Sequence, residues 1–392
     1  MPNGFIPTIL VTAPLGQNTA MPWANGKVKA CKFSAMLSTT LKQTCEGCFL
    51  NNRIEHIDSI RALAVLLMVM VHAAATWGPP PSTQSSLLVY FVSGMGGLAA
   101  PLFVTVFGWG CVRTNLSRSQ RIKRGGFFIA AQTGVNLSAP HLFEPFSPGV
   151  LTLFGLLILL QPVWLAPATK KPNRSHLSFL IILGFSLFFT LFLSQWQGSI
   201  EWSARNETSS LSQWMSHALL TGTYPAMPWV VFASLGAWIG CQEGRQITFP
   251  QNNTTFALVT LGLVCCALSF TYAWSTDQQW ALPTGKALLT FFPANAMFLI
   301  AALTGVCLLW LSIQNIPVKG LVPLGQRSLS VYFIHFIPIG LLYHIDEANA
   351  FTFIHSMGVV VIYTLTWIPV AHAWGHLAPR MDAEHALRWL TK

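Results

Sequence analysis

Charged residues are scarce in this 392-residue sequence, where Asp, Glu, Lys and Arg together make up only 9%. A soluble globular domain typically carries about 25% charged residues, so the sequence is not that of a soluble protein. Hydrophobic residues make up 53% of the chain and include 27 Phe and 15 Trp. One folded core would not bury so much apolar surface without lipid as a second solvent, which indicates an integral membrane protein.

Cysteine is also sparse, and eight residues in the whole chain are too few for a disulfide scaffold. Cys45 and Cys48 form a close pair, but with no second pair and no nearby His they are a weak sign of a zinc or redox site. Paired carboxylates, a phosphate-binding loop, a Gly-X-Ser-X-Gly elbow and a zinc ligand set are missing. The sequence therefore favours neither a hydrolase nor an ATPase, and we expect no metal.

Long apolar stretches are abundant, and about ten of them approach the roughly 20 residues that cross about 30 Å of hydrocarbon. Backbone polar groups have no water to bond inside a bilayer, so these stretches must be helical, and the alternation typical of a membrane barrel is absent. We predict an all-α polytopic membrane helical bundle. Its predicted spans are about 59–77, 86–111, 125–139, 149–167, 176–195, 227–242, 254–273, 288–312, 325–344 and 352–373.

The basic residues predict the orientation of this bundle. Of the 22 Lys and Arg residues, only Arg205 and Lys286 fall in the set of loops opposite to both termini, so the termini are predicted to be cytoplasmic. The net charge of +10 thus reflects topology, and we expect no nucleic acid. We expect a protein of a bacterial cytoplasmic (inner) membrane. Residues 1–52 form a poorly ordered cytoplasmic tail without a cleaved signal peptide, 53–375 the membrane domain, and 376–392 a cytoplasmic C-terminal tail.

The predicted first helix carries the ionisable residues that stand out. Asp58 and Arg61 lie at its cytoplasmic end and His72 well inside, and such groups are costly within a span and therefore candidates for function. Arg61 and His72 are separated by about three turns, or about 16 Å, so both project from one face of the helix. A snorkelling anchor and a hydrogen bond between helices explain the same pattern equally well.

This Arg-X10-His arrangement resembles the first-helix signature of the membrane acyltransferase-3 family. Three further segments are similar to that family in order along the chain: the aromatic stretch Pro101–Gly110, the Arg-X-X-Arg of Arg121–Arg124, and Leu324–His335, which matches a Ser-Tyr-X-X-Tyr-X-X-His segment. The chain departs from the pattern where Phe107 replaces a Ser and Leu329 replaces a Tyr. The resemblance extends over the whole predicted membrane domain.

A second resemblance is to the neighbouring heparan-glucosaminide N-acetyltransferase-like membrane proteins. Tyr224–Gly240 and Pro148–Leu157 are similar to segments of those proteins, which usually carry Asn at the position of His72. We assign the chain to the acyltransferase-3 type of O-acyltransferase, and the N-acetyltransferase-like alternative stays open.

The resemblance implies an enzyme that moves an acyl group, commonly acetyl, from cytoplasmic acyl-CoA to a hydroxyl or amine of an acceptor such as a sugar. Guanidinium groups bind phosphate oxygens bidentately, so the CoA phosphates are expected at a basic cluster beside Arg61. The cluster comprises Arg118, Arg121, Lys123 and Arg124. His72 is expected either to take the acceptor's proton as a general base or to carry the acyl group itself.

The remaining predicted site residues lie on both sides of the membrane. Arg61 and Glu144 complete the catalytic set, with Glu144, between two prolines at the membrane rim, expected to orient His72. The predicted acceptor-binding residues are Asp58, His141, Ser328, Tyr332 and His335. Ser328, Tyr332 and His335 share one stripe of a helix, where polar contact between helices is the alternative. The Trp-rich outer segment 196–226 is a candidate acceptor platform.

Two other classes of protein compete with the enzyme. A secondary transporter or flippase for a lipid-linked sugar would share the spans and the scattered His residues, but it usually needs a mid-membrane carboxylate, and none falls inside the predicted spans. A non-catalytic scaffold has no specific feature in its favour. Membrane lipid, acyl-CoA and a glycan or similar acceptor are the expected partners, while the acceptor's identity and the oligomeric state stay open.

Overall fold

The computed structural model describes residues 54–78, 87–242, 249, 252–349 and 351–391. The predicted N-terminal tail 1–52, with Cys45 and Cys48, lies outside the described residues.

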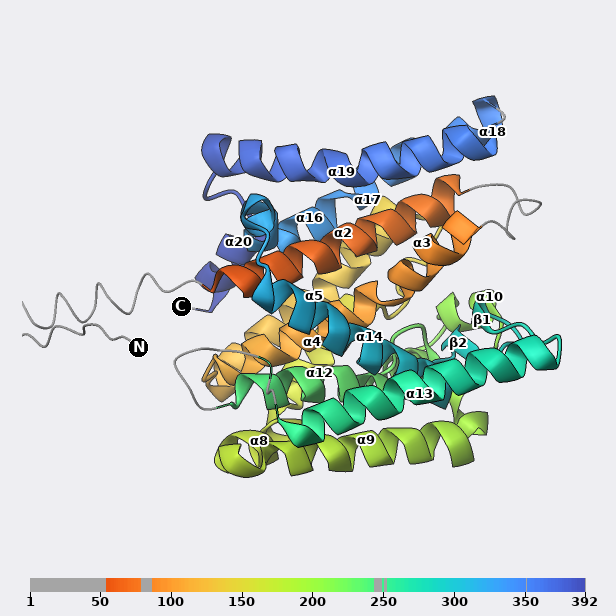
Figure 1. The fold of residues 1–392 in the computed structure, drawn as a ribbon. Coiled ribbons are helices and arrows are strands. Elements are labelled where there is room, and N and C mark those ends of the chain that lie inside the picture. The colour runs from red at the N-terminus through yellow and green to blue at the C-terminus, as the bar shows by residue number, and fades with distance from the viewer. Residues whose placement is uncertain (1–53, 79–86, 243–248, 250–251, 350, 392) are drawn as a thin grey trace, which may run out of the picture. The chain divides into compact units, whose positions relative to one another are not determined.

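The described chain is a bundle of helices whose long members run side by side (Figure 1). Its first half contains α2 (Glu55–Trp77), α3 (Leu87–Gly97), α4 (Ala99–Val112), α5 (Arg118–Ser138), α6 (Val150–Leu159), α7 (Gln161–Trp164), α8 (Ala166–Lys170), η2 (Pro172–Arg174), α9 (Ser175–Phe192) and η3 (Ser194–Gln197). The second half contains α10 (Trp202–Asn206), α11 (Leu211–Ser216), η4 (His217–Thr221), α12 (Ala226–Gly240), α13 (Asn253–Ser275), β1 (Ala281–Thr284), β2 (Leu289–Phe292), α14 (Ala296–Asn315), η5 (Lys319–Leu321), α15 (Val322–Gln326), α16 (Ser328–Ile334), α17 (Phe336–Leu341), α18 (Ile345–Asn349), α19 (Phe353–Leu377) and α20 (Ala383–Leu390).

Six described helices are long and apolar enough to cross a membrane. Their bounds are Glu55–Trp77, Val92–Val112, Pro172–Phe192, Asn253–Ser275, Ala296–Asn315 and Phe353–Leu377. Leu211–Thr221 and Ala226–Gly240, bent by 49° at a short break, add a seventh span if they count as one. The helical membrane bundle is therefore supported, while the predicted count of about ten spans and the cytoplasmic placement of the termini stay predictions.

The predicted eighth span, 288–312, begins too early. Residues 289–292 form strand β2, which pairs in parallel with β1, and α14 starts only at Ala296 because Asn295 caps it by accepting a hydrogen bond from the Phe298 N–H. Capping by a side-chain oxygen satisfies an N–H that the first helical turn leaves unpaired. This two-stranded sheet is a small departure from the predicted all-α fold.

Two buried polar residues of α5, Gln132 and Asn136, are satisfied by neighbouring groups. Buried Gln132 donates to Asn136 Oδ1 at 2.8 Å and accepts from the Leu151 N–H at 3.0 Å, and Asn136 donates to the Ser147 carbonyl at 2.9 Å. An unpaired buried polar group is costly, so these bonds join α5 to the start of α6. Gln132 and Asn136, which make α5 less apolar, thus hold α5 and α6 together.

The centre of the bundle is formed where α12 packs between α4 and α9, and where α2 packs against α4, α15 and α19. A Cβ atom on Gly236 would lie 1.8 Å from the Thr105 carbonyl oxygen, and one on Gly108 would lie 2.0 Å from the Ala233 carbonyl oxygen. Small residues at helix contacts allow close backbone approach in membrane bundles. These two glycines therefore determine how closely α4 and α12 pack.

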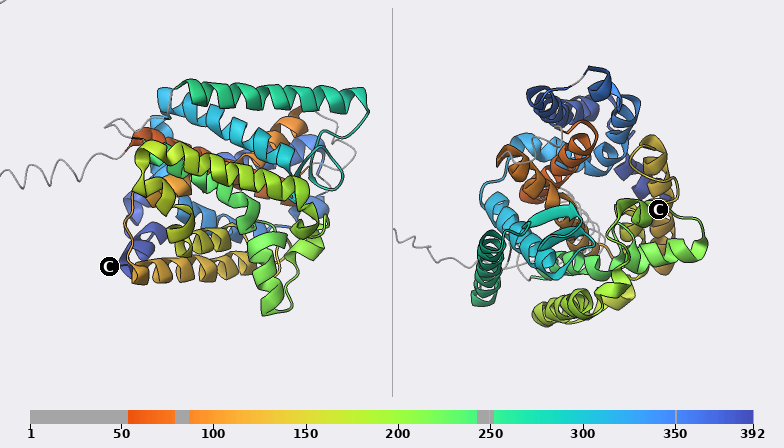
Figure 2. Two further views of the ribbon diagram at one scale, coloured as in Figure 1. Left: turned by 90° about the horizontal axis from the view of Figure 1, so that it is seen from below. Right: turned by 90° about the vertical axis from the view of Figure 1, so that its right-hand side faces the viewer.

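Peripheral helices expose apolar side chains. Viewed along the bundle in the right panel of Figure 2, α9, α13 and α19 lie on its outside. Ile181 on α9, Leu268 on α13 and Ile362 on α19 are 71%, 63% and 69% exposed. Large exposed apolar surface is unfavourable in water but matches the hydrocarbon of a bilayer, so these faces are expected to contact lipid.

The last helix, α20, docks onto α5 and α16. Glu384 accepts hydrogen bonds from the Leu329 N–H at 2.8 Å and from the Ser330 hydroxyl, so its carboxylate caps the first turn of α16. Gln120 donates to the Thr391 carbonyl at 2.9 Å. The predicted C-terminal tail therefore contains a helix that holds the start of α16.

Replacing Gly236 with Ala is expected to lower the free energy of unfolding by about 1–3 kcal/mol, because the added methyl meets backbone and forces α4 and α12 apart. Thermal unfolding of purified protein in detergent measures this loss. The matched control is Gly184→Ala, since a Cβ on Gly184 meets nothing within 4 Å. Equal melting temperatures for the two variants would contradict the close contact.

Burial raises the pKa of Glu384, and the hydrogen bonds from Ser330 and Leu329 oppose this only in part. The folded protein keeps a proton on this carboxyl at a pH where the unfolded chain has lost it, so its contribution to stability falls as the pH rises through the folded-state pKa. Glu384→Gln has no ionisable group at this position, so it removes this dependence of stability on pH. The melting temperature of wild type relative to Glu384→Gln should therefore decrease as the pH rises from about 4, the usual pKa of a Glu carboxyl in an unfolded chain, and a difference that does not change with pH would contradict this.

Candidate functional site

His72 lies in the second half of α2 and forms a hydrogen bond with His335, with 2.9 Å between His72 Nδ1 and His335 Nε2. The two rings are nearly parallel, with an interplanar angle of 19° and centroids 5.2 Å apart. The residues come from segments 263 positions apart in sequence. The fold therefore brings a predicted catalytic residue and a predicted acceptor-binding residue into direct contact.

The two imidazoles differ in accessibility. His335 is 0% exposed, whereas His72 is only partly buried. His335 lies at the junction of α16 and α17, where its Nδ1 is 3.1 Å from the Val331 carbonyl oxygen. The Tyr363 hydroxyl on α19 donates a hydrogen bond to the backbone carbonyl of His335. His72 is thus the more accessible residue of the pair.

A second histidine is linked to α2 one turn further on. The Thr76 hydroxyl donates to the His72 carbonyl at 3.1 Å and lies 3.2 Å from His141 Nε2, and the His141 ring stacks on Tyr343. Burial, followed by the nearby His344, lowers the pKa of His141, so this ring is neutral at pH 7. Since the Thr76 hydroxyl has one proton, it accepts from His141 Nε2, which leaves Nδ1 as a buried acceptor unpaired among the described residues.

Aromatic side chains surround His72 and lead toward the predicted outer segment. The His72 ring centroid lies 4.5 Å from that of Phe336 and 6.2 Å from that of Phe143. Phe143 in turn lies 6.3 Å from Trp202 on α10. Of the Trp residues in the predicted acceptor platform, Trp202 is therefore the one that the structure joins to the histidine pair.

Arg205 holds the segment that carries Trp202. It is 1% exposed, and its guanidinium donates to the backbone carbonyls of Ser199, Gln197 and Gly222 at 2.6 Å each and of Thr221 at 3.1 Å. Burial lowers its pKa to about 10, so the side chain stays charged at neutral pH. Arg205 therefore stabilises the segment and is not exposed for binding a substrate.

Glu144 is exposed in the turn between α5 and α6. Its neighbour Phe143 contacts the His72 ring, but the hydrogen bond to His72 Nδ1 comes from His335. Among the described residues, His335 rather than Glu144 is thus the hydrogen-bond partner of His72, and an orienting role for Glu144 stays a prediction. A contact of Glu144 with substrate stays a prediction.

Asp58 and Arg61 lie at the other end of α2. Arg61 Nη1 and Asp58 Oδ1 form an ion pair at 3.3 Å, with Asp58 3% exposed. A Cβ on Gly325 would lie 1.8 Å from the Asp58 carbonyl oxygen, so α15 passes very close to α2 here. Arg61 and His72 thus lie eleven positions apart on one continuous helix, and a shared site between them stays a prediction.

The predicted basic cluster occupies the start of α5, where Ser117 and Gln120 form a capping box. Arg118 and Lys123 are exposed. Arg121 donates to the Leu116 carbonyl at 3.0 Å, and Arg124 donates to the Thr391 hydroxyl at 3.1 Å. All four remain on the first two turns of α5, although Arg121 and Arg124 are partly occupied by protein contacts.

Ser328 and Tyr332 are buried within α16, 8% and 3% exposed. The Tyr332 ring packs against Phe103, His335 and Phe336. Of the predicted stripe, His335 is thus the residue in contact with His72, and the other two line the interior beside it.

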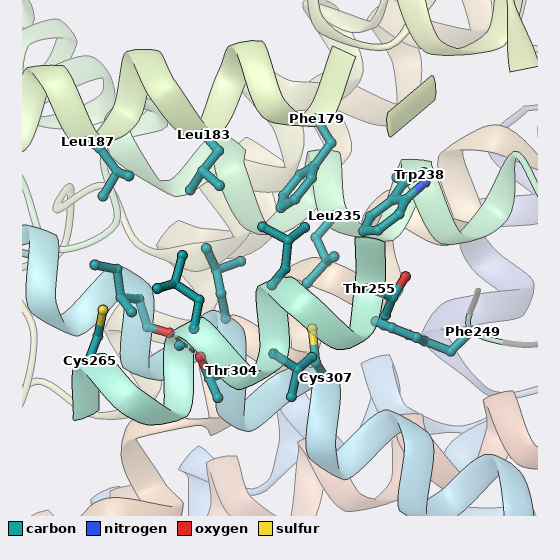
Figure 3. A pocket seen from close by; sticks show the side chains of 16 residues that line it. Phe179, Leu183, Leu187, Leu235, Trp238, Phe249, Thr255, Cys265, Thr304 and Cys307 are labelled. Carbon is teal, nitrogen blue, oxygen red and sulfur yellow. Dashed lines mark hydrogen bonds between the residues drawn. The ribbon is translucent and has the colours of Figure 1, made fainter. Parts of the chain in front are cut away.

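A cavity of about 170 Å³ lies elsewhere, between α9, α12, α13 and α14. Figure 3 shows Phe179, Leu183, Leu235 and Trp238 pointing into it opposite Cys265 and Cys307. Its lining is almost wholly apolar, and neither Arg61 nor His72 contributes to it. The predicted path from Arg61 to His72 is therefore separate from this cavity and stays a prediction.

Several residues of the site were not predicted from the sequence. Thr76 follows His72 by one helical turn, a spacing that could have drawn attention to it. Phe143 and Tyr363 carry no signal in sequence, because their contact with the histidine pair depends on how α5, α17 and α19 pack. Within the described ranges, no three His, Cys, Asp or Glu residues are grouped so as to hold a metal ion.

A search of curated proteins finds no match to this chain. The family model described as heparan-alpha-glucosaminide N-acetyltransferase, catalytic, matches residues 53–265, a region that includes His72, the basic start of α5, and both segments on which the second resemblance was based. The acyltransferase-3 assignment stays a prediction. With more than half of its length covered by this match, the chain belongs to the heparan-alpha-glucosaminide N-acetyltransferase catalytic family.

Proposed function

We propose that this chain is a membrane acetyltransferase that moves an acetyl group from acetyl-CoA to an amine or hydroxyl of an acceptor, with His72 as the reacting side chain. The observation that carries the proposal is the His72 imidazole, which is partly accessible, lies inside the family match and is backed by a second, fully buried imidazole. Family membership supports the acetyl transfer, and the acceptor is proposed to be a sugar.

The two ends of α2 suggest how the substrates are arranged. Arg61 and the start of α5 offer guanidinium and ammonium groups for the phosphates and pyrophosphate of CoA. His72 lies about 16 Å along the helix from Arg61, a distance that an extended pantetheine arm can cover. The acceptor then approaches from the side of Phe143, Trp202 and His141, where the unpaired Nδ1 of His141 can accept a hydrogen bond from a hydroxyl or amine.

The proposed reaction requires one proton acceptor and one stabilised charge. The acceptor nitrogen or oxygen attacks the thioester carbonyl while an imidazole nitrogen of His72 takes its proton, and collapse of the tetrahedral adduct breaks the carbon–sulfur bond. The proton then passes to the departing CoA thiolate, which leaves as the thiol. Such proton transfer contributes roughly 10² to 10⁴ in rate. An acetyl group carried on His72 itself is the alternative with the same products.

Replacing His72 with Ala is expected to lower acetyl transfer by roughly 10² to 10⁴-fold, because no other described imidazole takes its place at the end of α2. Transfer of radiolabelled acetyl from acetyl-CoA to a panel of amino sugars and glycans, in membranes containing the protein, measures this rate. The exposed His355→Ala on α19 is the control. Full activity of the His72 variant would overturn the catalytic assignment, and an inactive wild type over a broad panel would favour the transporter.

Replacing Arg121 and Arg124 together with Ala is expected to raise the KM for acetyl-CoA by about tenfold or more, since two charge-assisted phosphate contacts are lost. Once the donor is saturating, kcat should be nearly unchanged. Titration of acetyl-CoA into the purified protein checks binding directly. The control replaces the exposed pair Lys170 and Lys171, which removes the same charge from another loop, and an equal loss in both variants would show that only general charge matters.

A further inference from the structure

We propose that His335 is a positioning residue which keeps the His72 proton on Nδ1, so that His72 Nε2 is the nitrogen that reacts with substrate. This inference rests on the proposed function and specifies the atom through which it acts. It follows from two hydrogen bonds that connect the Val331 carbonyl, His335 and His72 in series.

The first step concerns His335. Its Nδ1 lies 3.1 Å from the Val331 carbonyl oxygen, and a carbonyl oxygen only accepts hydrogen bonds, so Nδ1 must carry a proton. In a neutral imidazole the other nitrogen is then an acceptor. A second proton would place a positive charge on a side chain that is 0% exposed, which is costly without a paired anion. His335 Nε2 is therefore an acceptor.

The second step transfers this constraint to His72. Because His335 Nε2 accepts, the 2.9 Å bond requires that His72 Nδ1 donates, and neutral His72 must have an unprotonated Nε2. His72 Nε2 makes no hydrogen bond with any residue in the described ranges, and His72 is the accessible member of the pair. The basic lone pair is thus directed away from His335 and toward the space that a substrate can reach.

The third step concerns the charge that forms during reaction. When His72 Nε2 takes the acceptor's proton, the positive charge spreads over the ring, and Nδ1–H then donates a charge-assisted hydrogen bond to His335 Nε2. The same bond holds the ring orientation before and after proton transfer. His335 touches neither reacting atom, and its effect is exerted through His72.

Two variants of His335 separate this role from simple packing. His335→Phe fills the space but offers no acceptor, and it is expected to lower kcat by about 10- to 100-fold, the rate equivalent of one hydrogen bond to a charged group, with the KM for acetyl-CoA unchanged. His335→Gln offers an amide oxygen as acceptor and should recover much of the rate. Equal kcat values for His335→Phe and wild type would overturn the proposal, as would equal losses in both variants.

A matched control is available on α19. His372 Nδ1 makes the same kind of bond to the carbonyl four residues earlier, at 2.9 Å from Ile368 O. His372→Phe removes that bond from another helix and should leave kcat unchanged. A loss as large as that of His335→Phe would show that any such substitution disturbs the bundle.

The position of the proton can also be observed without activity. In protein labelled with nitrogen-15 histidine, the His72 signals are identified by their loss in His72→Gln, and we expect a protonated Nδ1 and an unprotonated Nε2. A protonated Nε2 in neutral His72 would overturn the inference. If wild type transferred no acetyl group while this pattern was present, the proposed function would fail but the assignment of the proton would stand.

Discussion

The hydrogen bond between His72 and His335 depends on the packing of α2 against the α16–α17 junction and of that junction against α19. α2 supplies His72, the α16–α17 junction supplies His335, and the Tyr363 hydroxyl of α19 donates a hydrogen bond to the His335 carbonyl at that junction. Burying an imidazole in a bilayer is costly, and the hydrogen bond between the two rings offsets part of this cost for the buried His335. The contact between the two histidine rings therefore depends on how these helices pack.

Other buried polar groups follow the same rule at the ends of the bundle. Arg205 binds backbone carbonyls and thereby shapes the segment that carries Trp202. Glu384 caps α16 from a distant helix, which connects the C-terminal helix to the element that bears His335. The Glu384 contact joins segments 55 positions apart in sequence, whereas the Arg205 contacts stabilise one continuous segment.

Hydrophobic burial alone would not specify this bundle, because lipid is as apolar as its own core. The glycines at the α4–α12 contact instead allow backbones to approach closely, and the outer faces of α9, α13 and α19 are left to lipid. Packing of this kind depends on the shapes of the helices. Because α2 packs against α4, the close contact between α4 and α12 also affects the position of α2 and of His72.

The sequence by itself determined the membrane class and the helical character of the bundle, because apolar length is a local property, while the number of spans and the roles of Arg61 and His72 stay predictions. It also indicated the family, through segments such as Tyr224–Gly240. It did not predict strand β2, where Asn295 ends the sheet and starts a helix. Only the tertiary structure decided that His335 is the hydrogen-bond partner of His72, because that contact depends on which rings meet when residues hundreds of positions apart pack together.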